Sequence, residues 1–321
     1  RGRLPISPSS IKRFETLGIL ASWRMVLRQI RVAIFPRKAN SSFYRPFFKQ
    51  AMVSRFTQYS GESSSSDHAV ILPRLADGGH KNATAIIVHG LGDSGSGLAP
   101  VAHVLQQAIP TLRVVLPNAP VRPVTINRGM PMPAWFDMPD LPSDVVEGRT
   151  ALGDKRVEMR LDGMDLSVRE LEEITEAEAA MLPSMNAGET KAIFVIGFSQ
   201  GGAVALSSLL RRAAAKWAGC IALSTYLPNE MVQKACLPGN DENVELSRDA
   251  YVRKNVFVAH GDVDVMVPPS LMKHTKATLE RLGFQCDTRL YSGLDHSIAP
   301  KEIEDVITFL QNVLPEASTI H

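Results

Sequence analysis

The chain has 321 residues, of which 45% are hydrophobic and 21% are charged, with a net charge of +2. These proportions are typical of globular proteins and exclude a fully disordered, collagen-like or coiled-coil chain. No run of about 18 consecutive apolar residues occurs, so we expect no membrane-spanning helix. The three cysteines include no C-x-x-C pair, which argues against a disulfide framework or a zinc cluster and favours a reducing compartment.

The positive charge is concentrated at the start of the chain. The first 60 residues hold twelve of the 35 basic residues but only one of the 33 acidic residues, so the remainder carries a net charge of −9. An acidic body repels a phosphate backbone, so we expect no nucleic-acid partner.

The basic N-terminal segment has two interpretations. Drawn as a helix, residues 14–35 place Arg24, Arg28 and Arg31 on one side and apolar side chains on another, which is typical of an organelle transit peptide or a membrane-surface helix. The alternative is that the segment has no function and that Met52 is the true start of translation.

A serine-rich linker and a change of pattern define the expected domains. The run Ser60–Ser66 is a flexible linker by composition. We therefore expect a basic extension over 1–68, disordered or targeting, and one folded domain over 69–321.

Short apolar runs alternate with helical segments in this domain. The expected strands are Ala69–Pro73, Thr84–Val88, Leu112–Leu116, Ala192–Ile196, Gly219–Leu223, Asn255–Ala259 and Asp287–Tyr291. The expected helices are Leu98–Ala108, Leu166–Met181, Gln200–Ala214, Ser270–Leu282 and Glu302–Leu314. Most strand runs are continuously apolar, as in strands buried on both faces. The pattern predicts a single α/β domain with a mostly parallel, doubly wound sheet.

One connection departs from this alternation. Residues Pro117 to Gly163 are rich in proline, show no clear periodicity and far exceed the usual length of a loop between a strand and a helix. Long irregular connections in compact domains are often functional, so we interpret Pro120–Asp137 as a pocket wall. The polar tail Ser143–Arg160 is interpreted as a surface insertion.

A nucleophile motif lies at a strand-to-helix junction. Gly197, Ser199 and Gly201 form G-x-S-x-G directly after an apolar strand and before a helix of small residues, the context of a nucleophile elbow. The glycines are expected because side chains there would collide with the neighbouring strand and helix. The serine would be exposed at the carboxyl edge of the sheet, near the positive end of the helix dipole.

A serine nucleophile needs a base and a group that orients the base. His296 follows the last strand in a loop before a helix and is our predicted general base, whereas His89 and His260 are interpreted as structural. Asp262 and Asp264 both follow the preceding strand, and we choose Asp264 as the orienting carboxylate because it precedes the loop leading into a helix. Asp262 is then expected to brace the loop.

Two backbone N–H groups should stabilise the oxyanion of the reaction. The residue after the nucleophile, Gln200, supplies one, and Leu91 in the glycine-rich loop Val88–Gly97 supplies the other. The alternative of a phosphate-binding loop is disfavoured, because the loop has neither a Gly-Lys-Ser/Thr end nor G-x-G-x-x-G spacing. No metal-ligand spacing is present, so we expect neither a metal nor a cofactor.

Six motifs occur in order along the chain, and they are His89–Asp93, Pro117–Val124, Pro133–Asp137, Gly197–Gly202, Leu223–Pro228 and His260–Asp264. They resemble those of the acyl-protein thioesterases in the carboxylesterase and lysophospholipase family, and the resemblance covers residues 82 to 315. The resemblance implies an α/β-hydrolase fold and a cytoplasmic enzyme that removes palmitoyl groups from protein cysteines. It also supports Ser199, Asp264 and His296 as a triad, with Leu91 and Gln200 as oxyanion donors.

Three functions are left open. The first is a palmitoyl-protein thioesterase acting on S-palmitoylated proteins. The second is a broad carboxylesterase or lysophospholipase acting on oxygen esters of acyl lipids, and the third is a catalytically silent binding module. Peripheral membrane association and organelle targeting stay open as well.

An apolar wall is expected for the acyl chain, because each buried methylene contributes about 0.8 kcal/mol. The candidates are Leu98, Met130, Met132, Trp135 and Phe136, and the alternative is that they only pack the loop onto the core. The sequence departs from the family pattern at Leu98 and Tyr226, where the family carries aromatic and tryptophan residues respectively. The segment after Asp137 is also longer by more than a dozen residues, which leaves the acyl-chain preference open.

Overall fold

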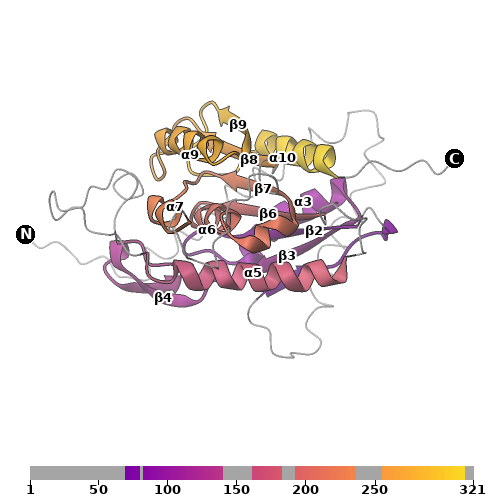
Figure 1. Cartoon of the computed structure of the whole chain (residues 1–321), viewed down its shortest axis with the longest axis horizontal. Coiled ribbons are helices and arrows are strands. Elements are labelled where there is room, and N and C mark those ends of the chain that lie inside the picture. Colours follow the sequence, from indigo (N-terminus) through magenta and orange to yellow (C-terminus); the bar gives the residue numbers. More distant parts are fainter. Residues whose placement is uncertain (1–68, 80–81, 140–160, 183–191, 236–254, 315–321) are drawn as a thin grey trace, which may run out of the picture. The chain divides into compact units, whose positions relative to one another are not determined.

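The apolar runs form one central sheet in the structure, which is a computed structural model. It describes residues 69–79, 82–139, 161–182, 192–235 and 255–314 (Figure 1). The expected N-terminal extension and the Ser143–Arg160 tail lie outside these residues.

The seven strands lie in the order β1-β3-β2-β6-β7-β8-β9. Among the described strands of this sheet, β1 runs antiparallel to its neighbour and the other strand pairs are parallel, which confirms the predicted fold class. The chain winds toward β3 after β2 and toward β7 after β6, so the winding direction reverses between the two central strands β2 and β6. Ligands bind at the carboxyl ends of strands at such a reversal. The strand bounds are β1 Ala69–Leu72, β2 Ala83–Val88, β3 Leu112–Pro117, β6 Ile193–Phe198, β7 Trp217–Leu223, β8 Asn255–Gly261 and β9 Gln285–Tyr291.

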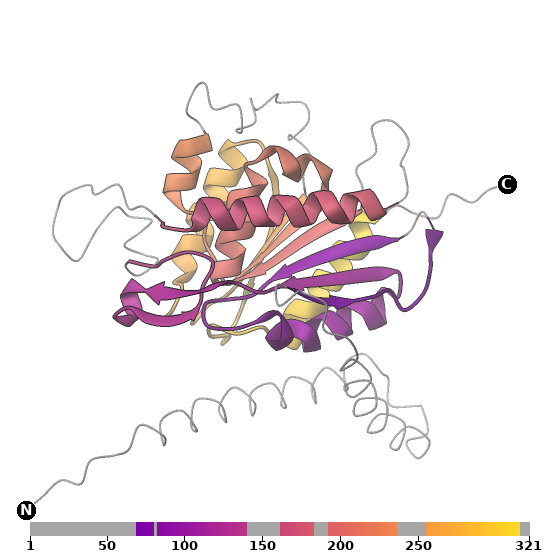
Figure 2. The same cartoon turned by 90° about the horizontal axis from the view of Figure 1, so that it is seen from below.

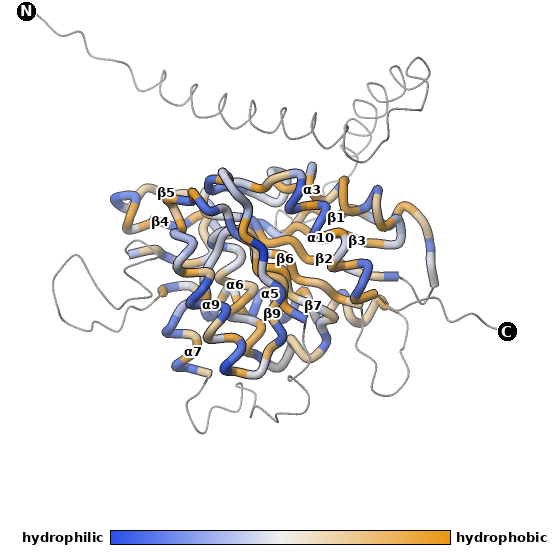
Figure 3. The backbone as a smooth tube through the Cα atoms, turned by 90° about the horizontal axis from the view of Figure 1, so that it is seen from above, coloured by the Kyte–Doolittle hydropathy of each residue, from blue (hydrophilic) through white to orange (hydrophobic). Residues whose placement is uncertain are grey.

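Helices cover both faces of the sheet, as Figure 2 shows. Helices α3 and α10 lie on one face and contact each other, whereas α5 and α6 lie together on the opposite face. Side chains of α5, α6 and α9 share one buried apolar cluster with the strands. Figure 3 shows the most apolar backbone along the central strands, with more hydrophilic helices around them. The helix bounds are α3 Gly95–Ala108, α5 Met164–Met181, α6 Gln200–Leu209, α7 Asn229–Ala235, α9 Pro269–Arg281 and α10 Pro300–Val313.

Three features differ from the sequence-based expectation. The proline-rich connection contains an antiparallel hairpin of β4 (Val121–Val124) and β5 (Met130–Pro133). The 3₁₀ turn η2 (Thr125–Asn127) lies in the loop between the two strands. Prolines are tolerated because both strands of a two-stranded ribbon are edge strands. The helix expected over Gln200–Ala214 ends at Leu209 and is followed by the 3₁₀ helix η3 (Arg212–Lys216), and the short α7 was not expected.

Over the described parts of the chain, none of the helices combines the length and the hydropathy needed to cross a lipid bilayer.

Candidate active site

Ser199 lies in a sharp turn between β6 and α6. Its backbone has φ 53° and ψ −121°, a conformation that non-glycine residues rarely adopt and that is typical of functional sites. A Cβ on Gly197 would come within 2.5 Å of Gly201 O, and one on Gly201 within 2.3 Å of Val88 O. The predicted reason for both glycines is therefore confirmed, because a side chain at either position would force the helix away from the strand.

Three side chains from separate loops form a continuous hydrogen-bonded chain. Ser199 Oγ lies 2.8 Å from His296 Nε2, and His296 Nδ1 lies 2.7 Å from Asp264 Oδ2. A carboxylate only accepts hydrogen bonds, so Nδ1–H donates to Asp264 and Nε2 is left to accept the serine proton. The imidazole also packs against the Phe198 ring, with 5.1 Å between ring centroids. This is the geometry that general-base activation of a serine requires.

The carboxylate of Asp264 is buried and fully occupied by donors. Its other oxygen, Oδ1, accepts the backbone N–H groups of Met266 and Val267, each at 2.9 Å. Burial alone would raise the pKa of Asp264, but hydrogen bonds from two histidines and a backbone N–H outweigh it and hold the pKa below its usual value. The group is therefore an anion at neutral pH, as the orienting carboxylate must be to stabilise an imidazolium.

Asp262 and His260 hold the surrounding loops. Asp262 Oδ1 accepts the N–H of Gly293 at 2.6 Å, which joins the loop after β8 to the loop that carries His296. His260 is fully buried, and its Nε2–H is shared between Val267 O at 2.7 Å and Asp264 Oδ2 at 3.4 Å, so it holds the loop around Asp264 in place. These contacts agree with the structural interpretation of both residues.

His89 is also held in a structural position. Its Nδ1–H donates to Gly90 O at 2.7 Å, and its Nε2 accepts the N–H of Ala119 at 3.0 Å. Burial lowers the pKa of the ring, which favours the neutral form that this pair of bonds requires. His89 therefore joins the glycine-rich loop after β2 to the end of β3.

The two predicted oxyanion donors lie after the two central strands. Leu91 follows β2, and Gln200 begins α6 directly after Ser199. Within the described residues, neither backbone N–H donates to a protein acceptor, although the neighbouring N–H groups of Gly92 and Ser199 do. Gln200 follows Ser199 in the chain, and Leu91 follows Gly90, where a Cβ would lie 3.3 Å from Ser199 Cβ. N–H groups in such positions, one of them at a helix N-terminus, are suited to binding an oxyanion.

The candidate acyl residues fall into two groups. Trp135, Phe136 and Leu98 are at most 2% exposed and pack in the interior. Met130 is 61% exposed on the β4–β5 hairpin, and the sulfur of Met132 lies beside Gly92, 4.0 Å from where a Cβ would be. The packing alternative thus fits the buried group, whereas the two methionines lie near the surface, with Met132 next to the oxyanion loop.

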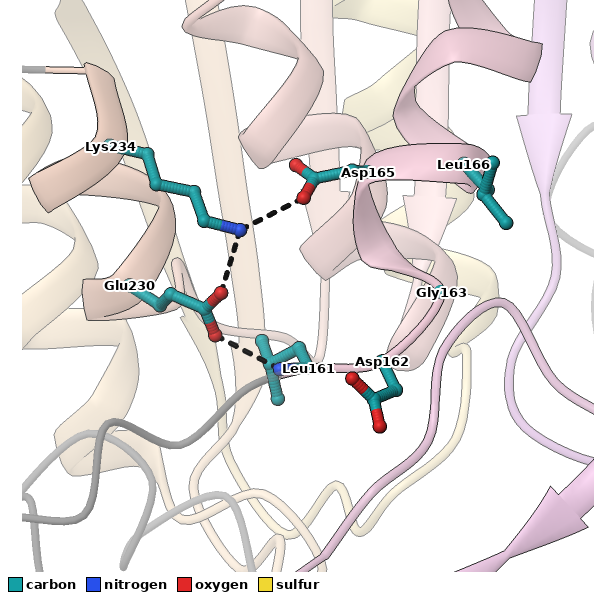
Figure 4. A pocket seen from close by; sticks show the side chains of 7 residues that line it. All are labelled: Leu161, Asp162, Gly163, Asp165, Leu166, Glu230 and Lys234. Atoms are coloured by element: carbon teal, nitrogen blue, oxygen red, sulfur yellow. Dashed lines mark hydrogen bonds and ion pairs between the residues drawn. The ribbon is translucent and has the colours of Figure 1, made fainter.

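A separate pocket of about 210 Å³ lies where α5 begins (Figure 4). Lys234 of α7 makes ion pairs with Glu230 Oε1 at 2.7 Å and with Asp165 Oδ2 at 2.9 Å, and Glu230 Oε2 accepts the N–H of Leu161. These bonds fasten α7 to the start of α5. The pocket contains no predicted site residue; its lining is Leu161, Asp162, Gly163, Asp165, Leu166, Glu230 and Lys234. Among the described residues, no group of three or more potential ligands could hold a metal ion.

Comparisons with known proteins identify the family of the chain. The family model described as phospholipase/carboxylesterase matches residues 75–314. An acyl-protein thioesterase 1 of Mycosarcoma maydis is 34% identical over 77% of this chain and 96% of its own length. A Candida albicans protein of the same name is 31% identical over 74% of this chain and 95% of its own.

Solved structures give the same result at the level of the fold. The Arabidopsis thaliana protein SOBER1 is 26% identical and superposes with a TM-score of 0.57, covering 73% of this chain and all of that one. Acyl-protein thioesterase 2 of Zea mays shares the fold at 23% identity, with a TM-score of 0.55 over 78% of this chain and all of that one. The chain belongs to the phospholipase/carboxylesterase family of α/β-hydrolases.

Proposed function

We propose that this chain is a serine hydrolase that cleaves palmitoyl thioesters from protein cysteines, with residues 69–321 as its catalytic domain. The observation that carries the proposal is the hydrogen-bonded chain from Ser199 Oγ through His296 to the buried Asp264. The choice of substrate is supported by curated relatives named acyl-protein thioesterase 1.

In the first half-reaction the serine is acylated. Ser199 Oγ attacks the thioester carbonyl carbon while His296 Nε2 takes the hydroxyl proton, and Asp264 stabilises the resulting imidazolium. The carbonyl electron pair moves to oxygen, where the N–H groups of Leu91 and Gln200 donate to it. The oxyanion then collapses, the carbon–sulfur bond breaks, and His296 returns the proton to the departing cysteine sulfur.

In the second half-reaction water releases the fatty acid. His296 takes a proton from a water molecule, whose oxygen attacks the acyl-enzyme carbonyl carbon. The same two N–H groups stabilise the second oxyanion. When it collapses, the bond to Ser199 Oγ breaks, the serine regains its proton from His296 and the carboxylic acid leaves.

A second candidate is a carboxylesterase or lysophospholipase that uses the same triad on oxygen esters. The description of the matching family model favours it. The two candidates share their chemistry and differ only in the group that leaves.

The proposal includes work in the cytoplasm, with peripheral association at the membrane where acylated proteins reside. Cys220 and Cys286 are free thiols, which suits a reducing compartment. The basic N-terminal segment keeps organelle targeting open.

The test is to compare kcat/KM of the purified protein on a palmitoyl-cysteine peptide, a lysophospholipid and p-nitrophenyl acetate, with Ser199→Ala as the control. We expect the highest value on the thioester peptide and no turnover by the control. A clear preference for the lysophospholipid would replace the first candidate by the second. Turnover by Ser199→Ala would contradict both.

A further inference from the structure

The segment Pro133–Phe136 is bonded to both loops that carry the oxyanion donors. On the loop after β2, the N–H of Gly92 donates to Pro133 O at 2.8 Å, and Trp135 Nε1–H donates to His89 O, also at 2.8 Å. On this loop the bonded groups are His89 O, before Leu91 in the chain, and the N–H of Gly92, after it. The position of the Leu91 N–H is therefore set by this segment from both directions.

At the start of α6, directly after the β6 turn, the contact is made by the side chain of Gln200. Its Oε1 accepts the N–H of Trp135 at 2.9 Å, and its Nε2–H donates to Phe136 O at 2.8 Å. The side chain is 3% exposed and both ends of its amide are used. The residue whose backbone N–H is the second oxyanion donor is thus tied to the segment that holds the first.

The segment itself is also bonded to α5 and to Pro120. Ser167 Oγ–H of α5 donates to Trp135 O at 2.5 Å, and the N–H of Ala134 donates to Pro120 O at 3.0 Å. The indole packs against the His89 ring, with 5.1 Å between centroids, and is 2% exposed. Because Ala134, Trp135 and Phe136 are buried and these bonds are formed, we expect the segment to keep a fixed position.

From these contacts we infer that Trp135 and the Gln200 side chain are positioning residues that set the separation between the N–H groups of Leu91 and Gln200. The inference rests on the proposed function only in that the two N–H groups bind a reaction oxyanion. It replaces the acyl-wall role of Trp135 by a role in transition-state stabilisation.

Trp135→Phe tests this directly, because it keeps a buried aromatic ring and removes the bond to His89 O. Trp217→Phe is the matched control, since Trp217 is also fully buried and its Nε1–H donates to Thr175 Oγ1 at 3.1 Å. Trp217 begins β7 and pairs with the start of β6, whereas Ser199 follows the end of β6. The substrate is p-nitrophenyl acetate, whose short acyl group does not depend on an acyl wall.

We expect Trp135→Phe to lower kcat by about 10- to 100-fold, because displaced oxyanion donors cost rate, with KM changed less than about threefold. Trp217→Phe should keep kcat within about threefold of the wild type at a similar loss of melting temperature. Equal loss of kcat in both variants, or a loss confined to KM, would overturn the inference.

A second variant and a second readout protect the test against misfolding. Gln200→Met keeps the backbone N–H and the side-chain volume but removes both amide bonds, and should reproduce the loss of kcat. Affinity for a trifluoromethyl ketone, whose carbonyl oxygen becomes an oxyanion when Ser199 adds, should fall in parallel with kcat/KM in both variants. Unchanged affinity in folded Trp135→Phe and Gln200→Met would overturn the inference. Failure of the proposed function would appear instead as an inactive wild type.

Discussion

The three loops that carry Ser199, Asp264 and His296 and the long connection from Pro117 to Gly163 are organised differently. Each triad loop directly follows a strand of the parallel sheet, so the end of that strand fixes where the loop begins. In the described residues 118–139 of the connection, no strand joins the central sheet. This part is held by the buried residues Ala134–Phe136 and by polar contacts, such as Asp137 accepting the N–H and the hydroxyl of Thr125 at 2.7 and 2.6 Å.

The difference indicates where chemistry and where specificity reside. Short loops at strand ends hold Ser199, His296 and Asp264 within hydrogen-bonding distance of one another. The connection contributes Trp135, which we infer to be a positioning residue, and the β4–β5 hairpin, which we expect to contact the substrate. Changes in the triad loops should therefore act on turnover, and changes in the hairpin of the connection should act on substrate choice. The following predictions test that division.

The largest effect is expected for Ser199→Ala, because the triad acts as a unit and loss of its serine typically costs on the order of 10⁶ in turnover. The variant should keep its melting temperature and should not be labelled by a fluorophosphonate probe. If the variant keeps its turnover and the probe labels another residue, the nucleophile is not Ser199 and the contrast between the triad loops and the connection fails.

The next largest effect is expected for Asp264→Asn. The amide cannot stabilise the imidazolium and favours the wrong tautomer, so kcat should fall roughly 10⁴-fold with KM nearly unchanged. Asp262→Asn is the matched control two residues away, and should be much milder because the Asp262 carboxylate accepts the backbone N–H of Gly293 rather than a bond from His296. If the two variants rank in the opposite order, Asp262 is the orienting carboxylate.

In the connection, Met130→Glu and Met132→Glu are expected to alter substrate choice. A charged side chain at either position should leave about two methylenes of the bound acyl chain in water, which costs ~1.6 kcal/mol of binding. KM for a palmitoyl substrate should therefore rise about tenfold, while KM for an acetyl ester stays constant. Leu166→Glu is the control, since Leu166 is similarly exposed but lines the separate pocket on α5. Equal losses on both substrates with a lower melting temperature would show that the hairpin is structural.

The smallest effect concerns Glu302 in the first turn of α10, just after the His296 loop. Burial raises the pKa of this carboxyl to about 8, although it accepts the N–H of Ala299. Its folded pKa exceeds the unfolded value of about 4.3, so its contribution to stability is full at low pH and is lost as pH rises through this range to about 8.

Glu302→Gln removes this titration, and its melting temperature should fall less than that of the wild type between pH 5 and 9. Glu304→Gln, in the same helix but partly exposed, should behave like the wild type. If the melting temperatures of the wild type and Glu302→Gln change with pH in the same way, Glu302 does not titrate in this range.

The fold and the residues of the triad loops could be predicted because their signals are local. An apolar strand followed by glycines and a polar residue is visible within about ten letters of sequence, and a parallel sheet brings such ends together. The β4–β5 hairpin was not predicted because its prolines argue against strands in general. The contact between Trp135 and Gln200 joins residues 65 positions apart and leaves no periodic pattern.

The left-handed backbone of Ser199 also affects how stable the protein is. A residue with a side chain at φ 53° and ψ −121° adds strain that the rest of the domain must compensate, and glycine alone adopts this conformation freely. Ser199→Gly should therefore yield an inactive protein with a higher melting temperature than Ser199→Ala. The strained turn that exposes the nucleophile therefore also lowers the free energy of unfolding of the domain.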